Sequence, residues 1–172
     1  MKMKVIAMLA AFALTASAVH AQELPRKVQN VEVLDLDGKP VKLPYFGEKN
    51  LMIFYVDPDR HKQNEDFTIE LEQNHRAESD NIHGFGVMNL KDAPMVPNGM
   101  ARNMAKKRTA KNGATVLADQ NRILSTAWAL GDCNNQFVLM IVSKEGELVF
   151  LRKGELSDAD KEAFYETIEK YK

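Results

Sequence analysis

The sequence predicts an α/β fold, a three-layer sandwich in which a mixed central sheet ends in an antiparallel hairpin and a C-terminal helix. Three observations predict it. Short apolar runs such as Leu51–Val56 and Phe137–Val142 are typical of buried strands. Segments with helical spacing of apolar residues separate most of these runs. The chain then closes with two strand-like runs, a short turn between them, and an amphipathic segment.

The start of the chain has the pattern of a secretory signal peptide. Two lysines precede an apolar run, Val5–Ala16, that is short for a membrane-spanning helix. Val19-His20-Ala21 then places small residues at a cleavage site. We therefore expect residues 1–21 to be removed and residues 22–172 to form one exported domain, either periplasmic or secreted. An uncleaved anchor is the alternative.

Charge and cysteine content narrow the possible functions. The formal net charge of −1 argues against general binding to nucleic acid or to anionic membrane surfaces. No later segment is apolar enough to span a bilayer, so we expect no stable membrane insertion after cleavage. Cys133 is the only cysteine, so the chain cannot form an intramolecular disulfide even in an oxidising compartment.

The first predicted strands form a hairpin followed by a central strand. Val31–Leu36 alternates apolar and acidic residues, as a half-buried strand does. Asp37–Pro40 has the composition of a turn, and residues 41–43 return as a short partner strand. Leu51–Val56 is then expected to be a central strand covered on both faces, which Asp57-Pro58 ends.

A helix is expected from Asn64 to about Ala77. Asn64 can cap the first N–H groups of this helix, and acidic residues follow in its first turn. Phe67 and Leu71 are four residues apart and should face the core. The apolar run Gly84–Leu90 comes next and is expected to be a second central strand.

A second helix is expected at Gly99–Lys111, ended by Gly113. Met100 and Met104 share one face of this helix, and we expect them to pack into the core while the basic residues are solvated. A third strand is expected at about residues 115–118.

The remaining elements complete the sandwich. Residues 123–130 suggest a short helix, and Phe137–Val142 a strand whose antiparallel neighbour is Glu147–Leu151. Ser157 and Asp160 have the spacing of a capping box that opens the last helix. That helix repeats apolar residues at Phe164, Ile168 and Tyr171, and we assign this face to the core.

Several stretches resemble known protein families. VEVLDLDGKPVKLPYFGEKNLMIFYVDPD resembles the opening of thioredoxin-like and thiol-peroxidase proteins, and FVLMIVSKEGELVFLRKGEL resembles their closing hairpin. A closer likeness, to the YtfJ-type family of periplasmic thioredoxin-like proteins, rests on VPNGMARNMAKK at 96–107, LADQNRILSTAWAL at 117–130 and MIVSKEGELVFLRKGELSDAD at 140–160. It covers roughly the second half of the chain, whereas the first half matches only the general fold. The resemblance implies an exported thioredoxin-like protein and carries little information on activity.

The corner after Leu51–Val56 differs from that of the thioredoxin-like oxidoreductases. In those enzymes two cysteines lie where this strand meets the next helix, whose N-terminus lowers the pKa of the first thiol. The matching positions here are Asp59 and Lys62, which cannot perform thiol–disulfide exchange. The enzymes also have a cis-proline before their fourth strand, and the matching stretch Asn134–Phe137 has no proline. The resemblance therefore implies the scaffold without its dithiol.

The same corner could instead hold a metal ion. Asp57, Asp59 and His61 alternate in the sequence, and His75 and His83 follow downstream. The other interpretation is that they are ordinary turn, cap and surface residues. No His-x-x-x-His or cysteine pair supports a zinc site, so we expect no metal and no other cofactor.

Cys133 is the one candidate catalytic residue. A peroxidatic thiol needs a neighbouring cation and hydrogen-bond donors to become a thiolate. Asp132 would instead raise the pKa of the adjacent thiol and oppose its reactivity. We favour a cysteine without a catalytic role.

The stretch Pro97–Met100 at the start of the second helix is a candidate ligand site. A helix N-terminus offers unpaired N–H groups to an anion, and glycine lets a ligand approach the backbone. The alternative is a surface helix with no ligand. Strand-to-helix corners of such folds gather at one end of the sheet, so this stretch should neighbour the earlier corner. The candidate ligand-binding residues are Asp59, His61, Lys62, Asn98 and Gly99.

Together these patterns predict a non-redox binding or accessory protein on a thioredoxin-like scaffold. Its expected partner is an unidentified envelope protein or a small anion. The alternative is a thiol-dependent peroxidase or oxidoreductase that acts through Cys133 or through a partner's thiol.

Overall fold

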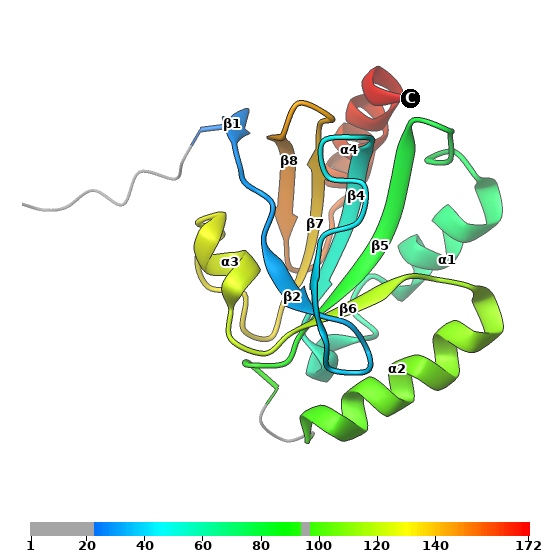
Figure 1. The fold of residues 1–172 in the computed structure, drawn as a ribbon. Coiled ribbons are helices and arrows are strands. Elements are labelled where there is room, and N and C mark those ends of the chain that lie inside the picture. Colours follow the sequence, from blue (N-terminus) through cyan, green and yellow to red (C-terminus); the bar gives the residue numbers. More distant parts are fainter. Residues whose placement is uncertain (1–22, 94–96) are drawn as a thin grey trace, which may run out of the picture.

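The computed structural model describes residues 23–93 and 97–172, so the predicted signal peptide lies outside the described residues (Figure 1). The strands are β1 (Arg26–Lys27), β2 (Glu32–Leu34), β3 (Pro40–Lys42), β4 (Asn50–Val56), β5 (Ile82–Asn89), β6 (Val116–Asp119), β7 (Phe137–Val142) and β8 (Glu147–Lys153). The helices are the short 3-10 turn η1 (Pro58–Arg60), α1 (Glu65–Asn74), α2 (Asn98–Asn112), α3 (Ile123–Ala127) and α4 (Asp158–Tyr171). Within the described ranges, no helix has the length and apolar character needed to cross a membrane.

The eight strands of the described ranges belong to one sheet, in the order β1-β8-β7-β4-β5-β6-β2-β3 (Figure 1). β4, β5 and β6 run parallel to one another, and β7 and β8 run antiparallel beside β4. The predicted order of a hairpin, three parallel strands with helical crossovers, a closing hairpin and a last helix is confirmed. β1, which pairs with β8, is not predicted, because two residues are too few to show an alternating pattern.

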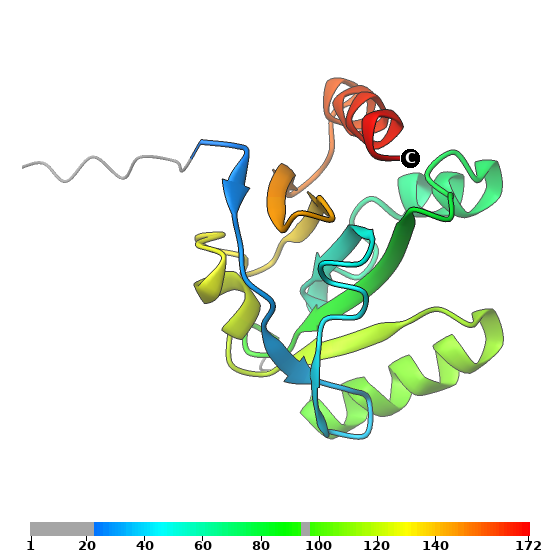
Figure 2. The same cartoon turned by 45° about the horizontal axis from the view of Figure 1, so that its top comes forward.

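One face of the sheet is closed by α3 and by the segment of chain that joins β1 to β2 (Figures 1 and 2). Leu51, Ile53 and Tyr55 point from β4 to this side and are fully buried beside Trp128 of the α3 region. α3 lies over this face and next to β2 (Figures 1 and 2). The tryptophan therefore belongs to the core, as the sequence predicts.

On the opposite face of the sheet, α1 and α4 cover the part that β7 and β8 form. Phe67 and Leu71 of α1 and Phe164 and Ile168 of α4 are buried there, as predicted from their spacing. The rings of Phe67 and Phe164 meet edge to face with their centres 5.5 Å apart. This contact joins the two helices into one layer.

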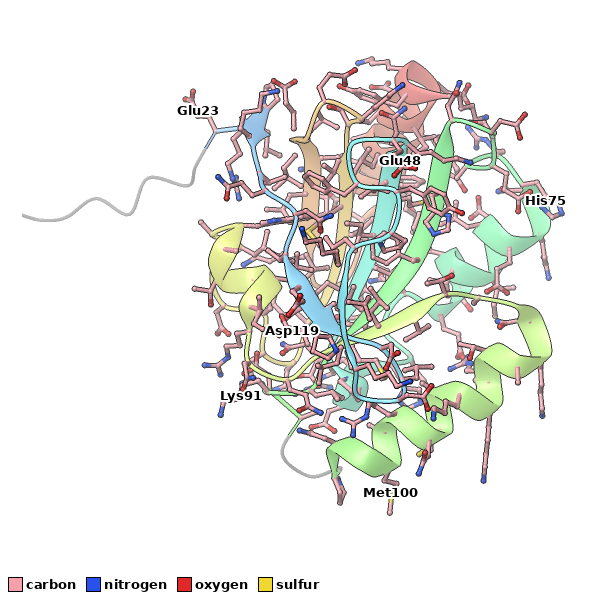
Figure 3. The ribbon with its side chains drawn as sticks, in the orientation of Figure 1. Glu23, Glu48, His75, Lys91, Met100 and Asp119 are labelled. Carbon is pink, nitrogen blue, oxygen red and sulfur yellow. The ribbon has the colours of Figure 1, made fainter. Side chains whose placement is uncertain are left out.

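α2 lies over the far side of the same face but covers it poorly. Ala101 is its one buried residue, in a small cluster with Leu90 and Ala118. Met100 and Met104 are 57% and 64% exposed, and Figure 3 shows Met100 projecting away from the protein. The expectation that they pack into the core is wrong. Helical spacing places two residues on one face of a helix but does not say what lies opposite that face.

Two further expectations on this face need correction. Asn64 has a left-handed backbone with φ of 62° and makes no side-chain cap on α1. Its amide instead donates to the Gly154 carbonyl at 2.9 Å and accepts the Leu156 N–H at 2.8 Å. β4 is also not covered on both faces, because Met52 and Phe54 on the α1 side remain partly exposed. The predicted capping box of α4, by contrast, is present.

Candidate functional site

The corner after β4 is built around the buried carboxylate of Asp57. Its Oδ1 accepts the Asp59 N–H at 2.9 Å and so begins η1, while its Oδ2 accepts the Asn135 N–H at 2.7 Å. Burial raises the pKa of Asp57, although these hydrogen bonds act in the opposite direction. The residue that ends the central strand therefore holds the corner against the loop before β7.

Two more hydrogen bonds join the same corner to that loop. The Asp57 N–H donates to the Gln136 carbonyl at 3.2 Å, and Gln63 Oε1 accepts the Phe137 N–H at 2.8 Å. Asn135, which precedes Gln136 in this loop, has a left-handed φ of 54°, a conformation that asparagine tolerates better than most residues. The side chains of Asp57 and Gln63 at this corner are thus paired with backbone N–H groups.

The predicted ligands at the corner lie on its outer surface. Asp59, His61 and Lys62 are all exposed, and His61 Nδ1 lies 3.0 Å from the Pro58 carbonyl oxygen. Across residues 23–93 and 97–172, no three His, Cys, Asp or Glu side chains are close enough together to hold a metal ion. Nothing in this geometry favours the metal interpretation of Asp57, Asp59 and His61.

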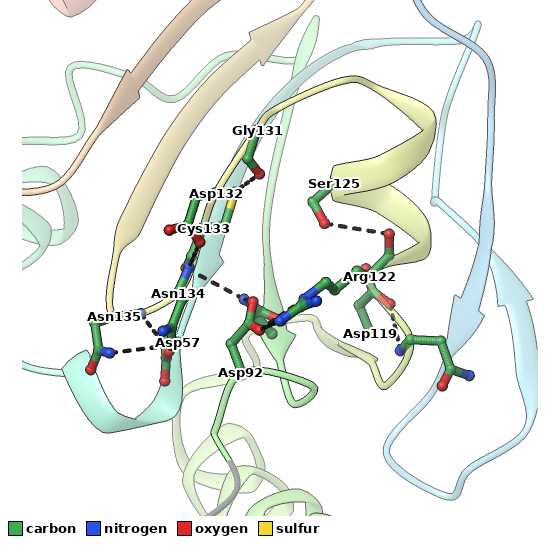
Figure 4. A network of polar contacts seen from close by, with 12 residues as sticks. Asp57, Asp92, Asp119, Arg122, Ser125, Gly131, Asp132, Cys133, Asn134 and Asn135 are labelled. Carbon is green, nitrogen blue, oxygen red and sulfur yellow. Dashed lines mark hydrogen bonds and ion pairs between the residues drawn. The ribbon is translucent and has the colours of Figure 1, made fainter.

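A second polar cluster lies beside the corner, with Asn89 and Asp92 buried and Arg122 exposed (Figure 4). Asn89 Nδ2 donates to Asp92 Oδ2 at 2.6 Å and approaches the Cys133 carbonyl at 3.4 Å, and Arg122 forms an ion pair with Asp92. Burial alone would raise the pKa of Asp92, but the bonds from Arg122 and Asn89 outweigh it and lower that pKa. The cluster fastens the loop after β5 to α3 and to the loop before β7.

Cys133 is enclosed by these elements and is 2% exposed. Its Sγ lies 3.6 Å from the Gly131 carbonyl oxygen (Figure 4). Burial raises the pKa of the Cys133 thiol to about 11, so at neutral pH the thiol keeps its proton and is a weak nucleophile. Its position resembles that of a structural cysteine.

Asp119 ends β6 as Asp57 ends β4. Its carboxylate accepts the N–H groups of Ile123 and Leu124, each at 2.9 Å, and so begins α3, and the Tyr55 hydroxyl donates to it at 3.3 Å. Sequence reasoning missed both Asp119 and Asn89 as members of this end of the sheet. The sequence did carry a signal for both residues, because a polar residue follows or ends the apolar run of each of the three parallel strands.

Solved structures with this arrangement of elements include thioredoxins, a thiol-disulfide oxidoreductase domain and a peroxiredoxin-like protein. The exposed lipoprotein thioredoxin Etrx1 of Streptococcus pneumoniae matches with a TM-score of 0.56 and 18% identity, over 83% of this chain and 99% of that one. The thioredoxin domain of a thiol-disulfide oxidoreductase from Bacteroides vulgatus matches with a TM-score of 0.56 and 17% identity, over 85% and 95%. A peroxiredoxin-like protein from Aquifex aeolicus matches with a TM-score of 0.60 and 11% identity, over 86% and 88%.

The fold is thioredoxin-like. At these identities the likeness extends to the fold alone. No family model matches the chain, and no curated protein sequence matches it.

The start of α2 lies at the same end of this thioredoxin-like sheet as the corner after β4 (Figure 1). Pro97 precedes the helix and provides no side-chain cap, and Gly99 is exposed with no other residue within 4 Å of the place of a β-carbon. A groove does join the corner to α2, but its lining includes His61, Met104 and Arg108 rather than Asn98 or Gly99. His61 is thus the predicted ligand that the fold brings to a hollow shared by both elements.

Proposed function

We propose that this chain is an exported, non-redox binding or accessory protein on a thioredoxin-like scaffold. The observation that carries the proposal is the state of the corner after β4. Asp59 and Lys62 stand where the dithiol of the resembling enzymes would lie, and Asp57 and Gln63 bond to the loop that would carry the cis-proline. Internal hydrogen bonds thus link the two segments between which those enzymes receive their substrates.

Export and family membership are part of the same proposal. The N-terminal pattern predicts a signal peptide over residues 1–21 and a mature domain over residues 22–172. Similarity to an exposed lipoprotein thioredoxin supports an extracytoplasmic location. Of the resembling families, the YtfJ-type family of periplasmic proteins accounts best for the stretches at 96–107, 117–130 and 140–160.

The alternative function, a thiol-dependent peroxidase or oxidoreductase, depends on Cys133 or on a partner's thiol. Burial and the raised pKa of Cys133 weigh against a thiolate at neutral pH. A thiol supplied by a partner would meet a corner where the Asp57 carboxylate already accepts the N–H groups of Asp59 and Asn135.

The test measures insulin reduction and peroxide turnover by the exported protein and by its Cys133→Ser variant. We expect both proteins to stay at the background rate, because neither the corner nor Cys133 supplies a thiolate. A structural neighbour with an intact dithiol serves as the positive control. Turnover by the natural chain that is lost in Cys133→Ser would establish the thiol enzyme and overturn the proposal.

A further inference from the structure

A groove crosses the face of the sheet between α1 and α2. It consists of two adjoining hollows of about 920 and 420 Å³, which share Phe54, Gly86 and Val116 in their lining. Met52 and Gly84 continue the floor toward the start of β5, and Val56 and Met88 continue it toward the end. The floor is thus an apolar strip of the central strands that no helix covers.

Two glycines of β5, Gly84 and Gly86, leave part of the groove floor without side chains. Gly84 is exposed and Gly86 is half exposed, although β5 lies between β4 and β6 in the middle of the sheet. A β-carbon at Gly86 would meet Val116 Cγ2 at 3.5 Å, which is ordinary van der Waals contact. Packing therefore does not demand glycine at this position. A glycine inside a strand often marks a place where another chain or a ligand comes close to the backbone.

The walls of the groove carry opposite charges. α1 has four acidic residues and no basic one, whereas α2 has five basic residues and no acidic one. Glu72, Glu78 and Asp80 line the end of the groove near the start of β5. Arg108 and His61 line the other end, beside the corner after β4.

Most of the charged side chains that line the groove have no ion-pair partner in the part of the chain that the structure describes. Among the described residues, the side chains of Glu72, Asp80 and Arg108 make no hydrogen bond or ion pair, and no ion pair links α1 to α2. Exposed Met104 stands at the rim on the α2 side, with a flexible apolar side chain that can adapt to a bound surface. The groove therefore has an apolar centre, an acidic end and a basic end.

We propose that this groove binds an extended peptide segment of a partner protein, apolar in its middle and oppositely charged at its two ends. The basic end of the segment lies against Glu72 and Asp80, and its acidic end lies against Arg108. Apolar side chains between them rest on Phe54 and Val116 above Gly86. The inference rests on the binding role proposed above and names its site and ligand class.

Charge complementarity favours a peptide over other occupants of an apolar groove. A fatty-acyl ligand carries one charged end, which would leave the other end of this groove facing its apolar tail. A peptide can carry both charges and can present alternate side chains to the floor. Its binding should weaken with added salt, because both charged ends are exposed to solvent.

The experiment measures binding of three fluorescent synthetic peptides to the exported protein. All three have leucines alternating with serines in the middle. One has lysines at one end and glutamates at the other, the second has lysines at both ends, and the third has glutamates at both ends. We expect the bipolar peptide to bind about fivefold tighter than either control, as exposed ion pairs allow.

Variants of the groove locate the site. Gly86→Leu should reduce binding of the bipolar peptide by at least about tenfold, because the leucine fills the floor, while Gly86→Ala should bind nearly as well as the natural chain. Arg108→Glu should reverse the preference in favour of the peptide with lysines at both ends. Lys107→Glu, with the same change of charge outside the groove lining, should leave the preference unchanged.

Several results would overturn the inference. They are failure of the bipolar peptide to bind, equal binding by Gly86→Leu, and equal effects of Arg108→Glu and Lys107→Glu. Saturable binding of a fluorescent fatty acid that Gly86→Leu abolishes would assign the groove to a lipid. Dimerisation lost in Gly86→Leu would assign it to a second copy of the chain. Thiol turnover would overturn only the non-redox role, since peptide binding in the groove is measured separately.

Discussion

α4 and α2 are helices of similar length on the same face of the sheet, yet they are attached in different ways. α4 buries Phe164, Tyr165 and Ile168 and begins with a full capping box. α2 buries Ala101 alone and begins without a side-chain cap. The charges of the two helices also differ. Asp160 in the first turn of α4 pairs with Arg152, whereas every charged residue of α2 is basic.

The difference shows which part of this layer stabilises the fold, and it leaves the other part for the binding that we propose. Removing α4 from the sheet would expose large aromatic and branched side chains, at a cost of about 25 cal/mol per Å² of apolar surface. α2 gives up little apolar surface when it moves, so a partner in the groove could shift it at low cost. Three measurements sharpen the contrast between the two helices.

The largest effect is expected from truncating the core under α4. Phe164→Ala should lower the free energy of unfolding by about 3–5 kcal/mol, because the ring is fully buried between Phe67 and Phe150. Met104→Ala on α2 should change it by less than about 0.5 kcal/mol, since the side chain is exposed. Denaturant unfolding monitored by Trp128 fluorescence measures both. Similar losses in the two variants would show that α2 is packed as tightly as α4.

Amide hydrogen exchange tests the same contrast without a mutation. The amides of α2 should exchange at least about tenfold faster than those in the middle of α4, because α2 can open without exposing a large apolar cluster. Mass spectrometry of peptides from the native protein gives both rates in one experiment. If α2 were protected to the level of α4, the contrast between the helices would disappear.

The smallest effect concerns the helix starts. Ser157→Ala should cost about 1 kcal/mol, because the Ser157 hydroxyl accepts the Asp160 N–H and the Asp160 carboxylate accepts the Ser157 N–H. Asn98→Ala at the start of α2 should cost less than about 0.5 kcal/mol, since no side-chain cap is formed there. Thermal unfolding at constant pH gives the comparison. A cost at Asn98 equal to that at Ser157 would mean that α2 has a cap in solution.

Much of the fold could be predicted because its signals are local. The runs at Leu51–Val56 and Phe137–Val142 became β4 and β7, and the pairing of Ser157 with Asp160 became the start of α4. Chain direction and short connections then limit how these elements can pair. The absence of cysteines at Asp59 and Lys62 is also a property of the sequence alone.

The candidate sites were predicted less well because they depend on neighbours that are distant in sequence. Asn64 was expected to cap α1, but its amide bonds to the loop before α4, ninety residues or more away. Asp57 was expected at a turn, and its burial against Asn135 depends on how β7 enters the sheet. Of the predicted ligands, His61 alone lines the groove that the corner shares with α2.

The sequence by itself determined the order of the elements, the parallel crossovers, the closing hairpin and the absence of cysteines at Asp59 and Lys62. It did so because residue periodicity, capping residues and side-chain chemistry act over a few neighbouring positions. The tertiary structure alone decided that Met100 and Met104 face solvent, that Cys133 is enclosed, and that Gly84 and Gly86 lie in an open groove. Those outcomes depend on which distant surface comes to lie opposite each residue, and periodicity along the chain does not contain that information.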